Sequence, residues 1–265
     1  MALYGVLGDI HGNREALQAV LEKLDGLGVS RLLCVGDVVG YNADPDECAT
    51  RLRLREATCI AGNHDLIGTG RLGFERCSNK AMHALKRTRR ELLPETAAWL
   101  ETLPSHALVE DRYVLTHGGV RDVQQYMTHP KHVIENVAYL RADFPARNVC
   151  FFGHTHDQKV FEVVGETVRD IDLAASEGRI RLEPGREYFV NPGSVDAARK
   201  RGSKLAQFAV LDTSDATVTF ADVAYDDDAS EEKARENGYR IEPWRDRLYD
   251  LGRRINARLG IANGA

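Results

Sequence analysis

The segment that decides the fold is Leu3-Tyr4-Gly5-Val6-Leu7-Gly8-Asp9-Ile10-His11-Gly12-Asn13, an apolar run that ends in a polar motif flanked by glycines. A short apolar run that ends in Gly is typical of a buried strand, and residues 31–36 form a second one. Between the two runs, apolar residues recur at the spacing of one helical face: Leu17, Val20, Leu21 and Leu24. The sequence therefore predicts a strand–helix–strand unit with parallel strands and a right-handed crossover.

Five short polar motifs each follow a strand-like run. They are Gly8-Asp9-Ile10-His11-Gly12-Asn13, Gly36-Asp37, Gly62-Asn63-His64-Asp65, Thr116-His117-Gly118 and Gly153-His154-Thr155-His156. A structural role explains one Asp or one buried His, but it does not explain five such clusters at the same place relative to a strand. Together they supply carboxylate, imidazole and amide groups in the mix that binds two metal ions around a phosphate ester.

The spacing and number of the donors favour two metal ions. Asp9 and His11 are two residues apart, so an extended backbone would point both side chains the same way, and His154 and His156 repeat this spacing. The full set of candidate donors is Asp9, His11, Asp37, Asn63, His117, His154 and His156. Seven donors are too many for one site with an open position, and they fit two sites that share a bridging carboxylate. The mixture of carboxylate and imidazole suits Mn, Fe, Zn or Ni better than Ca or Mg.

The rest of the chain predicts one domain with a second sheet. Helices are expected over 45–53, 77–93, 95–103 and near 131–142, and strands over 56–61, 107–109, 112–116, 148–152, 158–164, 187–190, 204–212 and 216–224. A strand-dominated second half suggests that a second sheet packs against the first. The acidic stretch Asp226-Asp227-Asp228 is typical of a solvated loop, and 229–260 of a largely charged helical tail.

Composition favours a cytoplasmic protein. The net charge of the 265 residues is −5, so no global field draws the chain to nucleic acid or to an anionic membrane. The N-terminus lacks a basic region and reaches Asp9 too early for a signal peptide, and no apolar run approaches the roughly 20 residues of a membrane span. The five cysteines are odd in number and widely spaced, which is typical of small buried hydrophobes in a reducing compartment.

The ordered set of motifs resembles the calcineurin-like metallophosphoesterases, whose pattern is D-x-H, G-D, G-N-H-[DE], a later His and G-H-x-H. The resemblance covers about residues 3–212. It implies an α/β fold in which a central two-sheet β-sandwich is flanked by helices on both sides, a four-layer αββα arrangement. The binuclear metal site is expected at the C-terminal strand ends. We expect the metallophosphoesterase domain over residues 1–225 and a charged helical C-terminal extension, packed on the same domain, over residues 226–265.

The resemblance also implies roles for the motif residues. Metal one would take Asp9, His11 and His156, metal two would take Asn63, His117 and His154, and Asp37 would bridge. The implied cofactors are two divalent transition-metal ions, with Mn expected first and Fe, Zn or Ni as alternatives. A hydroxide that bridges the metals is the natural nucleophile, because coordination lowers the pKa of water.

The two residues after Asn63 are expected to have roles other than metal binding. In the family, the histidine at the position of His64 faces the leaving oxygen of the substrate. A group that titrates near neutrality can donate a proton there, so His64 is expected to act as general acid. The alternative is a positioning hydrogen bond to phosphate without proton transfer. Asp65 is expected to fix the loop.

Three further features bear on the substrate. Protein serine/threonine phosphatases and symmetrical dinucleoside tetraphosphatases usually carry an arginine soon after Gly-Asp, and residues 36–45 have none, which favours the smaller bacterial and archaeal phosphodiesterase-like branch. Asn191-Pro192-Gly193-Ser194 fits that branch but is also a strong turn signal by itself. Arg199 and Arg201 belong to a basic cluster that would be either a rim for an anionic substrate or a solvated loop. Tyr41 follows Asp37 closely in the chain, so we expect it to stack on a substrate base, whereas Arg87, Arg89 and Arg90 indicate surface charge.

The sequence thus predicts an enzyme that hydrolyses a phosphomonoester or phosphodiester bond in a small soluble substrate such as a nucleotide. One alternative is a non-catalytic protein-binding scaffold of the same fold, as in a retromer subunit, which would need neither His64 nor the complete ligand set. A protein serine/threonine phosphatase is a second alternative, disfavoured by the missing arginine. Nucleic acid is disfavoured as a partner by the negative net charge and the lack of an extended basic stripe.

Overall fold

A computed structural model of the chain describes residues 2–196 and 204–259, whose strands form two sheets of six. The first sheet has β1 (Leu3–Leu7), β2 (Arg31–Cys34), β3 (Thr58–Cys59), β9 (Arg179–Arg181), β11 (Ala206–Asp212) and β12 (Thr217–Val223), in the order β3-β2-β1-β11-β12-β9. The second has β4 (Ala107–Val109), β5 (Tyr113–Leu115), β6 (Val149–Phe151), β7 (Gln158–Val164), β8 (Thr167–Asp170) and β10 (Glu187–Pro192), in the order β4-β5-β6-β10-β7-β8. The sequence did not predict β8 and β9.

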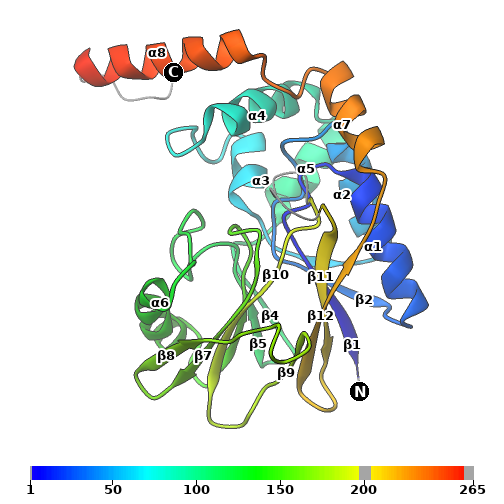
Figure 1. Cartoon of the computed structure of the whole chain (residues 1–265), viewed down its shortest axis with the longest axis vertical. Helices are drawn as coiled ribbons and strands as arrows, with labels where there is room; N and C mark the ends of the chain where they lie inside the picture. Colours follow the sequence, from blue (N-terminus) through cyan, green and yellow to red (C-terminus); the bar gives the residue numbers. More distant parts are fainter. Residues whose placement is uncertain (1, 197–203, 260–265) are drawn as a thin grey trace.

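Helices cover the outer faces of both sheets (Figure 1). On the first sheet these are α1 (Arg14–Gly26), α2 (Pro45–Leu54) and α5 (Pro94–Thr102), which share one buried cluster with the strands beneath them. On the second sheet α6 (Pro130–Asp143) packs in the same manner. A third cluster fills the space between the sheets. The expected αββα sandwich is therefore confirmed.

Strand β1 shows how the apolar run at the N-terminus produces these layers. Its alternating side chains divide between two cores: Tyr4 and Val6 lie between the sheets, and Leu7 lies under the helices. Gly5 also faces the helix layer, where an added Cβ would collide with the side chain of Leu24. A central strand that is buried on both faces reads as a continuous apolar run, which is the pattern seen at residues 3–7.

The strand directions bring five chain segments to one edge of the sandwich. Strands β1, β2 and β3 run parallel in the first sheet, and β5, β6 and β10 run parallel in the second. The segments that follow β1, β2, β3, β5 and β6 are the five polar motifs. Two more helices, α3 (Asn63–Gly68) and α4 (Asn79–Glu91), follow β3 at this edge. Helix α3, which was not expected from the sequence, begins within the third motif.

The C-terminal part adds α7 (Asp227–Glu236) and α8 (Pro243–Leu259). The expected acidic loop at 226–228 is wrong, because the Asp226 side chain accepts a hydrogen bond from the Ala229 N–H at 3.0 Å and caps α7. Lys233 of α7 forms ion pairs with Glu15 and Asp44 at 2.6 Å each. Helix α8 runs beside α4 and extends beyond the sandwich (Figure 1). The division into a domain over residues 1–225 and an extension over residues 226–265 stays a prediction, and the Lys233 ion pairs agree only with its expected packing on the same domain.

Within residues 2–196 and 204–259, no helix combines the length and the apolar character that crossing a membrane requires.

Candidate metal centre

The five motifs meet where the C-terminal ends of the two sheets face each other. All seven candidate donors lie here, and all except His156 are buried. Two groups of three, Asp9 with His11 and His156, and Asp37 with His117 and His154, each place their ligand atoms within 4.8 Å of one another. Since each group draws on segments from both sheets, the site depends on the sandwich being assembled.

The backbone at this edge is not extended, which corrects the expectation from the i, i+2 spacing. Five of the donors have positive φ angles between 51° and 68°: Asp9, His11, Asp37, His154 and His156. This left-handed conformation costs about 1 kcal/mol or more at a residue other than Gly, although Asp and His tolerate it better than most. Backbone hydrogen bonds hold it, because the N–H groups of Ile10 and His11 both donate to the Asp37 carbonyl, at 2.8 and 2.9 Å.

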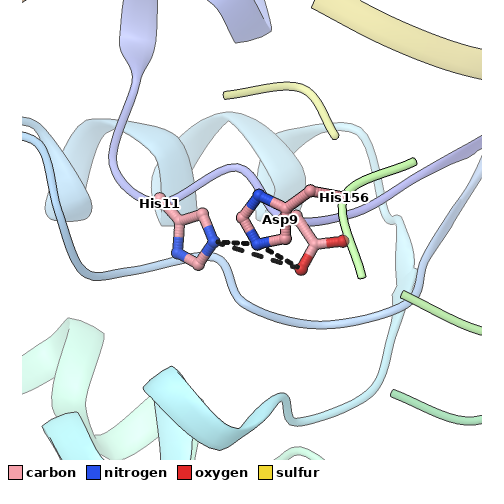
Figure 2. A group of neighbouring side chains, drawn as sticks. All are labelled: Asp9, His11 and His156. Carbon is pink, nitrogen blue, oxygen red and sulfur yellow. Dashed lines mark hydrogen bonds and ion pairs between the residues drawn. The ribbon is translucent and has the colours of Figure 1, made fainter. Parts of the chain in front are cut away.

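The first donor group joins the motif after β1 to the motif after β6 (Figure 2). The Nε2 atoms of His11 and His156 are 3.1 Å apart, and the Asp9 Oδ1 atom lies 3.5 Å from the His156 Nε2 and 4.0 Å from the His11 Nε2. The backbone N–H of His154 contacts both oxygens of the Asp9 carboxylate at 3.1 Å, which fixes the orientation of that carboxylate. Three donor atoms therefore point at one small space.

The second group surrounds His117. Its Nε2 atom lies 3.0 Å from the Asn63 Oδ1 atom and 3.3 Å from the Asp37 Oδ2 atom. The same Asp37 oxygen lies 3.8 Å from the His11 Nε2, so this carboxylate stands between the two groups. Its other oxygen, Oδ1, accepts the backbone N–H of His64 at 2.8 Å. The geometry thus gives Asp37 a position that fits a bridge.

The donor set fits two divalent ions of the transition series. Bonds of about 2.0–2.2 Å to one ion place neighbouring donor atoms about 2.9–3.5 Å apart, close to the spacings observed. The Nδ1 atoms of His117 and His11 lie 2.7 Å from the Val35 carbonyl and 3.3 Å from the Val39 carbonyl, respectively. A carbonyl only accepts, so Nδ1 carries a proton in each ring, and Nε2 is the atom that can bind an ion.

The Nε2 atom of His154 supports the same conclusion. This atom is buried, and the described residues offer it no hydrogen-bond partner. A buried polar atom without a partner is costly and calls for an explanation. A metal ion at the second group would satisfy it.

The pKa values within the second group also fit a cation site. Burial by itself would lower the pKa of His117, but the Asp37 carboxylate opposes this, and the pKa is raised to about 9. His154 is different, because burial and the neighbouring His117 together lower its pKa to about 3. Against the penalty of burial, the surrounding histidines hold the pKa of Asp37 well below its usual range. Hence His154 is neutral, Asp37 is ionised, and the proton on His117 stands where an ion would bind.

His64 lies beside both groups. Its ring centroid is 4.5 Å from that of His11 and 4.7 Å from that of Tyr41, and the Asp37 side chain accepts its backbone N–H. Gly40, with a φ of 120°, makes room for this ring, because an added Cβ would overlap the His64 Nδ1 atom. His64, Asp37 and His11 also form a third compact group of donor atoms, so proximity alone does not separate a ligand from an acid.

Asp65 holds the loops that carry these residues. Its carboxylate accepts the backbone N–H groups of Asp37, Val38, Val39 and Gly62 at 2.8–3.1 Å. It therefore ties the segment after β2 to the segment after β3, which is the loop-fixing role expected from the sequence.

The turn at 191–194 does more than reverse the chain. The Asn191 amide donates to the Gly153 carbonyl and to the Thr155 hydroxyl, and the Ser194 hydroxyl donates to the Asp9 carbonyl, all at 2.9 Å. It thereby braces the segments on which Asp9, His154 and His156 stand.

A pocket opens over the two donor groups. Tyr41 lines it together with Asp37, Asn63 and His64. The pocket is also lined by residues outside the five motifs, which were not predicted from the sequence: Arg76, Gln124 and Tyr126. Arg76 pairs with Asp122 at 2.8 Å, and the Tyr126 ring lies 4.1 Å from that of His154. They stand on connecting segments between motifs, and only their nearness to a motif in the chain could have drawn attention to them. Arg199 and Arg201 lie outside the described residues.

Comparison with known proteins agrees with this geometry. The model of the calcineurin-like phosphoesterase superfamily domain matches residues 2–216. An uncharacterized protein of Methanocaldococcus jannaschii is 30% identical over 259 residues, which are 95% of this chain and 99% of that protein. A metallophosphoesterase from Sphaerobacter thermophilus has 27% identity and a TM-score of 0.72, over 89% of this chain and 94% of that one. A hypothetical protein from Pyrococcus horikoshii, 18% identical, shares the fold with a TM-score of 0.69 over 89% and 93% of the two chains.

Proposed function

The chain belongs to the calcineurin-like phosphoesterase superfamily, and from this premise we propose that it hydrolyses a phosphomonoester or phosphodiester bond in a small soluble substrate, with two divalent metal ions as cofactors. The observation that carries the proposal is the convergence of two donor groups on Asp37, with His64 in the same pocket. A substrate phosphoryl group placed in this pocket would meet the donor groups on one side and the His64 imidazole on another.

We assign Asp9, His11 and His156 to one ion, Asn63, His117 and His154 to the other, and Asp37 to both. When bound, the ions supply positive charge at the phosphoryl oxygens and a water-derived nucleophile at neutral pH. The protein's own part is to hold the donors rigidly, through the Asp65 and Ser194 hydrogen bonds, so that little reorganisation accompanies the reaction. Mn is our first choice of metal, and Fe, Zn and Ni are compatible with the same carboxylate, amide and imidazole donors.

His64 is proposed as the general acid. An imidazole can give its proton to the ester oxygen as the bond to phosphorus breaks, so that an alcohol leaves instead of an alkoxide. Gly40 and Tyr41 confine the ring beside Asp37, which limits the orientations that it can adopt. Tyr41, whose ring lies next to that of His64, is proposed to stack on an aromatic part of the substrate, and Arg199 and Arg201 to attract its charge.

The two alternative functions predict different behaviour. A protein-binding scaffold would not need His64, six donors in two compact groups and Asn63 beside His117, so this arrangement favours an enzyme. A protein serine/threonine phosphatase would be expected to carry an arginine after Asp37, and the arginine that lines this pocket, Arg76, comes from a different segment. All five cysteines are free and buried, which supports our proposal of the cytoplasm as the compartment.

The proposal is tested by metal removal and return. The protein is stripped with a chelator and assayed against a panel of phosphomonoesters, phosphodiesters and dinucleotides, before and after Mn is added. We expect no turnover of any ester without metal and rapid turnover of at least one small ester with it. Wild-type protein that takes up two Mn ions and hydrolyses none of the panel, while it captures a protein partner, would favour the scaffold.

A further inference from the structure

A second cavity, separate from the metal centre, has a strongly basic lining. It has a volume of about 640 Å³ and lies between α4 and the segment from α7 to α8. Four of the cations that line it belong to α4: Lys86, Arg87, Arg89 and Arg90. Three more face them from the C-terminal segment: Arg235, Arg240 and Arg245. No residue lines both this cavity and the pocket over the metal centre.

Few carboxylates balance this charge. Glu242 is the carboxylate in the lining, Glu91 pairs with Arg87 at 2.9 Å, and Glu231 pairs with Arg235 and Arg240 at 3.5 and 2.6 Å. Two other carboxylates of α8, Asp246 and Asp250, accept the Asn79 amide instead. Seven cations against three carboxylates leave four positive charges unbalanced among these groups.

Several cationic groups remain available. Among the residues that the structure describes, Lys86, Arg90 and Arg245 make no ion pair. Arg89 makes none either, but its Nε and Nη2 groups donate to the Ile67 carbonyl. The Nε atom of Arg87 is buried and has no acceptor there. In a protein with a net charge of −5, this positive charge is confined to one place, and a bound anion would reduce the repulsion among the cations.

Aromatic rings complete the lining. The Phe74 ring lies beneath Arg89 and Lys86, at 4.7 and 5.5 Å from its centroid. Trp244 is 57% exposed and has the Arg245 guanidinium 5.1 Å from its ring centroid. Tyr249 adds a third ring. Arginines bind phosphate oxygens by paired N–H groups, and exposed aromatic rings stack on bases.

We propose that this cavity binds a small ligand with several phosphate groups and an aromatic base, that is, a nucleoside polyphosphate. The volume lies within the range of about 300–1,000 Å³ that is typical of small-ligand sites. The phosphates would lie against the arginines of α4, and the base against Trp244. This site does not depend on the metal centre or on the proposed hydrolysis.

The test uses the fluorescence of Trp244, which reports on the cavity alone. The chain has two tryptophans, so Trp99→Phe in the full-length, metal-loaded protein leaves Trp244 as the sole reporter. The probe is the β,γ-methylene analogue of ATP, compared with adenosine and inorganic triphosphate. We expect the analogue to change the Trp244 emission at micromolar concentration, to bind more tightly than either fragment, and to weaken as salt is raised.

Charge-reversal variants test whether the analogue binds in this cavity. Arg90→Glu and Arg245→Glu should each weaken binding tenfold or more, whereas Arg53→Glu, which makes the same change at an exposed position of α2, should stay within twofold. Arg90→Gln serves if the reversed charge disturbs folding, which circular dichroism would show. Equal weakening by the Arg53 and Arg90 variants would overturn the proposal, because it would indicate only a general field. So would a failure to bind the analogue, including the case in which a single-stranded oligonucleotide binds instead.

Discussion

The candidate metal centre and the basic cavity are built in opposite ways. The metal centre joins segments that are remote in the chain, such as Asp9 and the backbone of His154, 145 residues apart, and almost all of its donors are buried. The cavity is lined by one helix, the C-terminal segment and Phe74, and most of its cationic side chains are long and exposed. Metal donors must be held within a few tenths of an ångström, whereas flexible guanidinium groups can adapt to a phosphate.

This difference indicates which part of a fold can form each kind of site. Short Asp, His and Asn side chains reach an ion only if the backbone itself is bent around it, which is why five donors adopt positive φ. The packed edge of the sandwich can stabilise such a backbone. A helix surface cannot bend in this way, but it can present a row of arginines such as Arg87 and Arg90 at little conformational cost.

The largest effect is expected from Asp37→Asn. The amide keeps an oxygen that can accept the His64 N–H but removes the charge shared by both donor groups. We expect turnover to fall at least about 10³-fold and both ions to bind more weakly, because a shared electrostatic contact is lost. Metal analysis and a phosphodiester assay would measure this, with the exposed Asp25→Asn as control. If the variant kept two ions per chain and normal turnover, Asp37 would not be a metal ligand. If the variant also bound the nucleotide analogue more weakly, the cavity would not be independent of the metal centre.

His64→Ala should have the next largest effect. If His64 is a general acid and not a ligand, the variant should retain both ions while kcat falls by roughly 10²–10⁴. The loss should be smallest for nitrophenolate, which scarcely needs a proton as it leaves, and largest for an alkoxide. His129→Ala, an exposed histidine, is the control. Equal losses for all leaving groups would assign His64 to phosphate positioning, and loss of metal would make it a ligand.

The two regions also differ in how far they could be predicted from the sequence. The five motifs follow strands whose C-terminal ends must meet in an αββα sandwich, so the motif pattern was enough to place their donors together. The left-handed backbone at Asp9 and His11 could not be predicted, because it depends on the carbonyl of Asp37 in a neighbouring segment.

The cavity was missed for a different reason. The arginines of α4 were interpreted as surface charge, since nothing in their own segment indicated that Arg240 and Arg245 would face them. Likewise β8 and β9 are short, with mostly exposed side chains, and lack an apolar run. Features encoded within a single segment could be predicted from the sequence, whereas features that arise when two segments pack together could not.

A change of pH should affect the two regions differently, and its effect should be smaller than that of either substitution above. A metal ion must displace the proton from His117, whose pKa is raised to about 9 in the metal-free protein. Apparent metal affinity should therefore fall as pH falls below about 9, approaching tenfold per unit well below that pKa, or about 16-fold between pH 9 and pH 7.5. The arginines of the cavity keep their charge throughout this range, so binding of the ATP analogue should change less than twofold. Calorimetric titrations at several pH values would measure both, and a flat metal affinity would show that His117 is not a ligand.

The smallest effect is expected from Asp226→Ala, which removes the cap of α7. Loss of an N-cap bond costs about 0.5–2 kcal/mol, and for a chain of this size about 1 kcal/mol lowers the melting temperature by roughly 2–4 °C. Asp228→Ala, in the same first turn, removes only a charge near the helix N-terminus and should cost less than half as much. Because α7 leads to the arginine-bearing wall of the cavity, hydrogen exchange should rise in α7 and the ATP analogue should bind somewhat more weakly. Since the metal donors are held by other segments, kcat should stay within twofold. If kcat fell with the cap, the C-terminal helices would be part of the catalytic framework, and the contrast between a rigid centre and an independent cavity would fail.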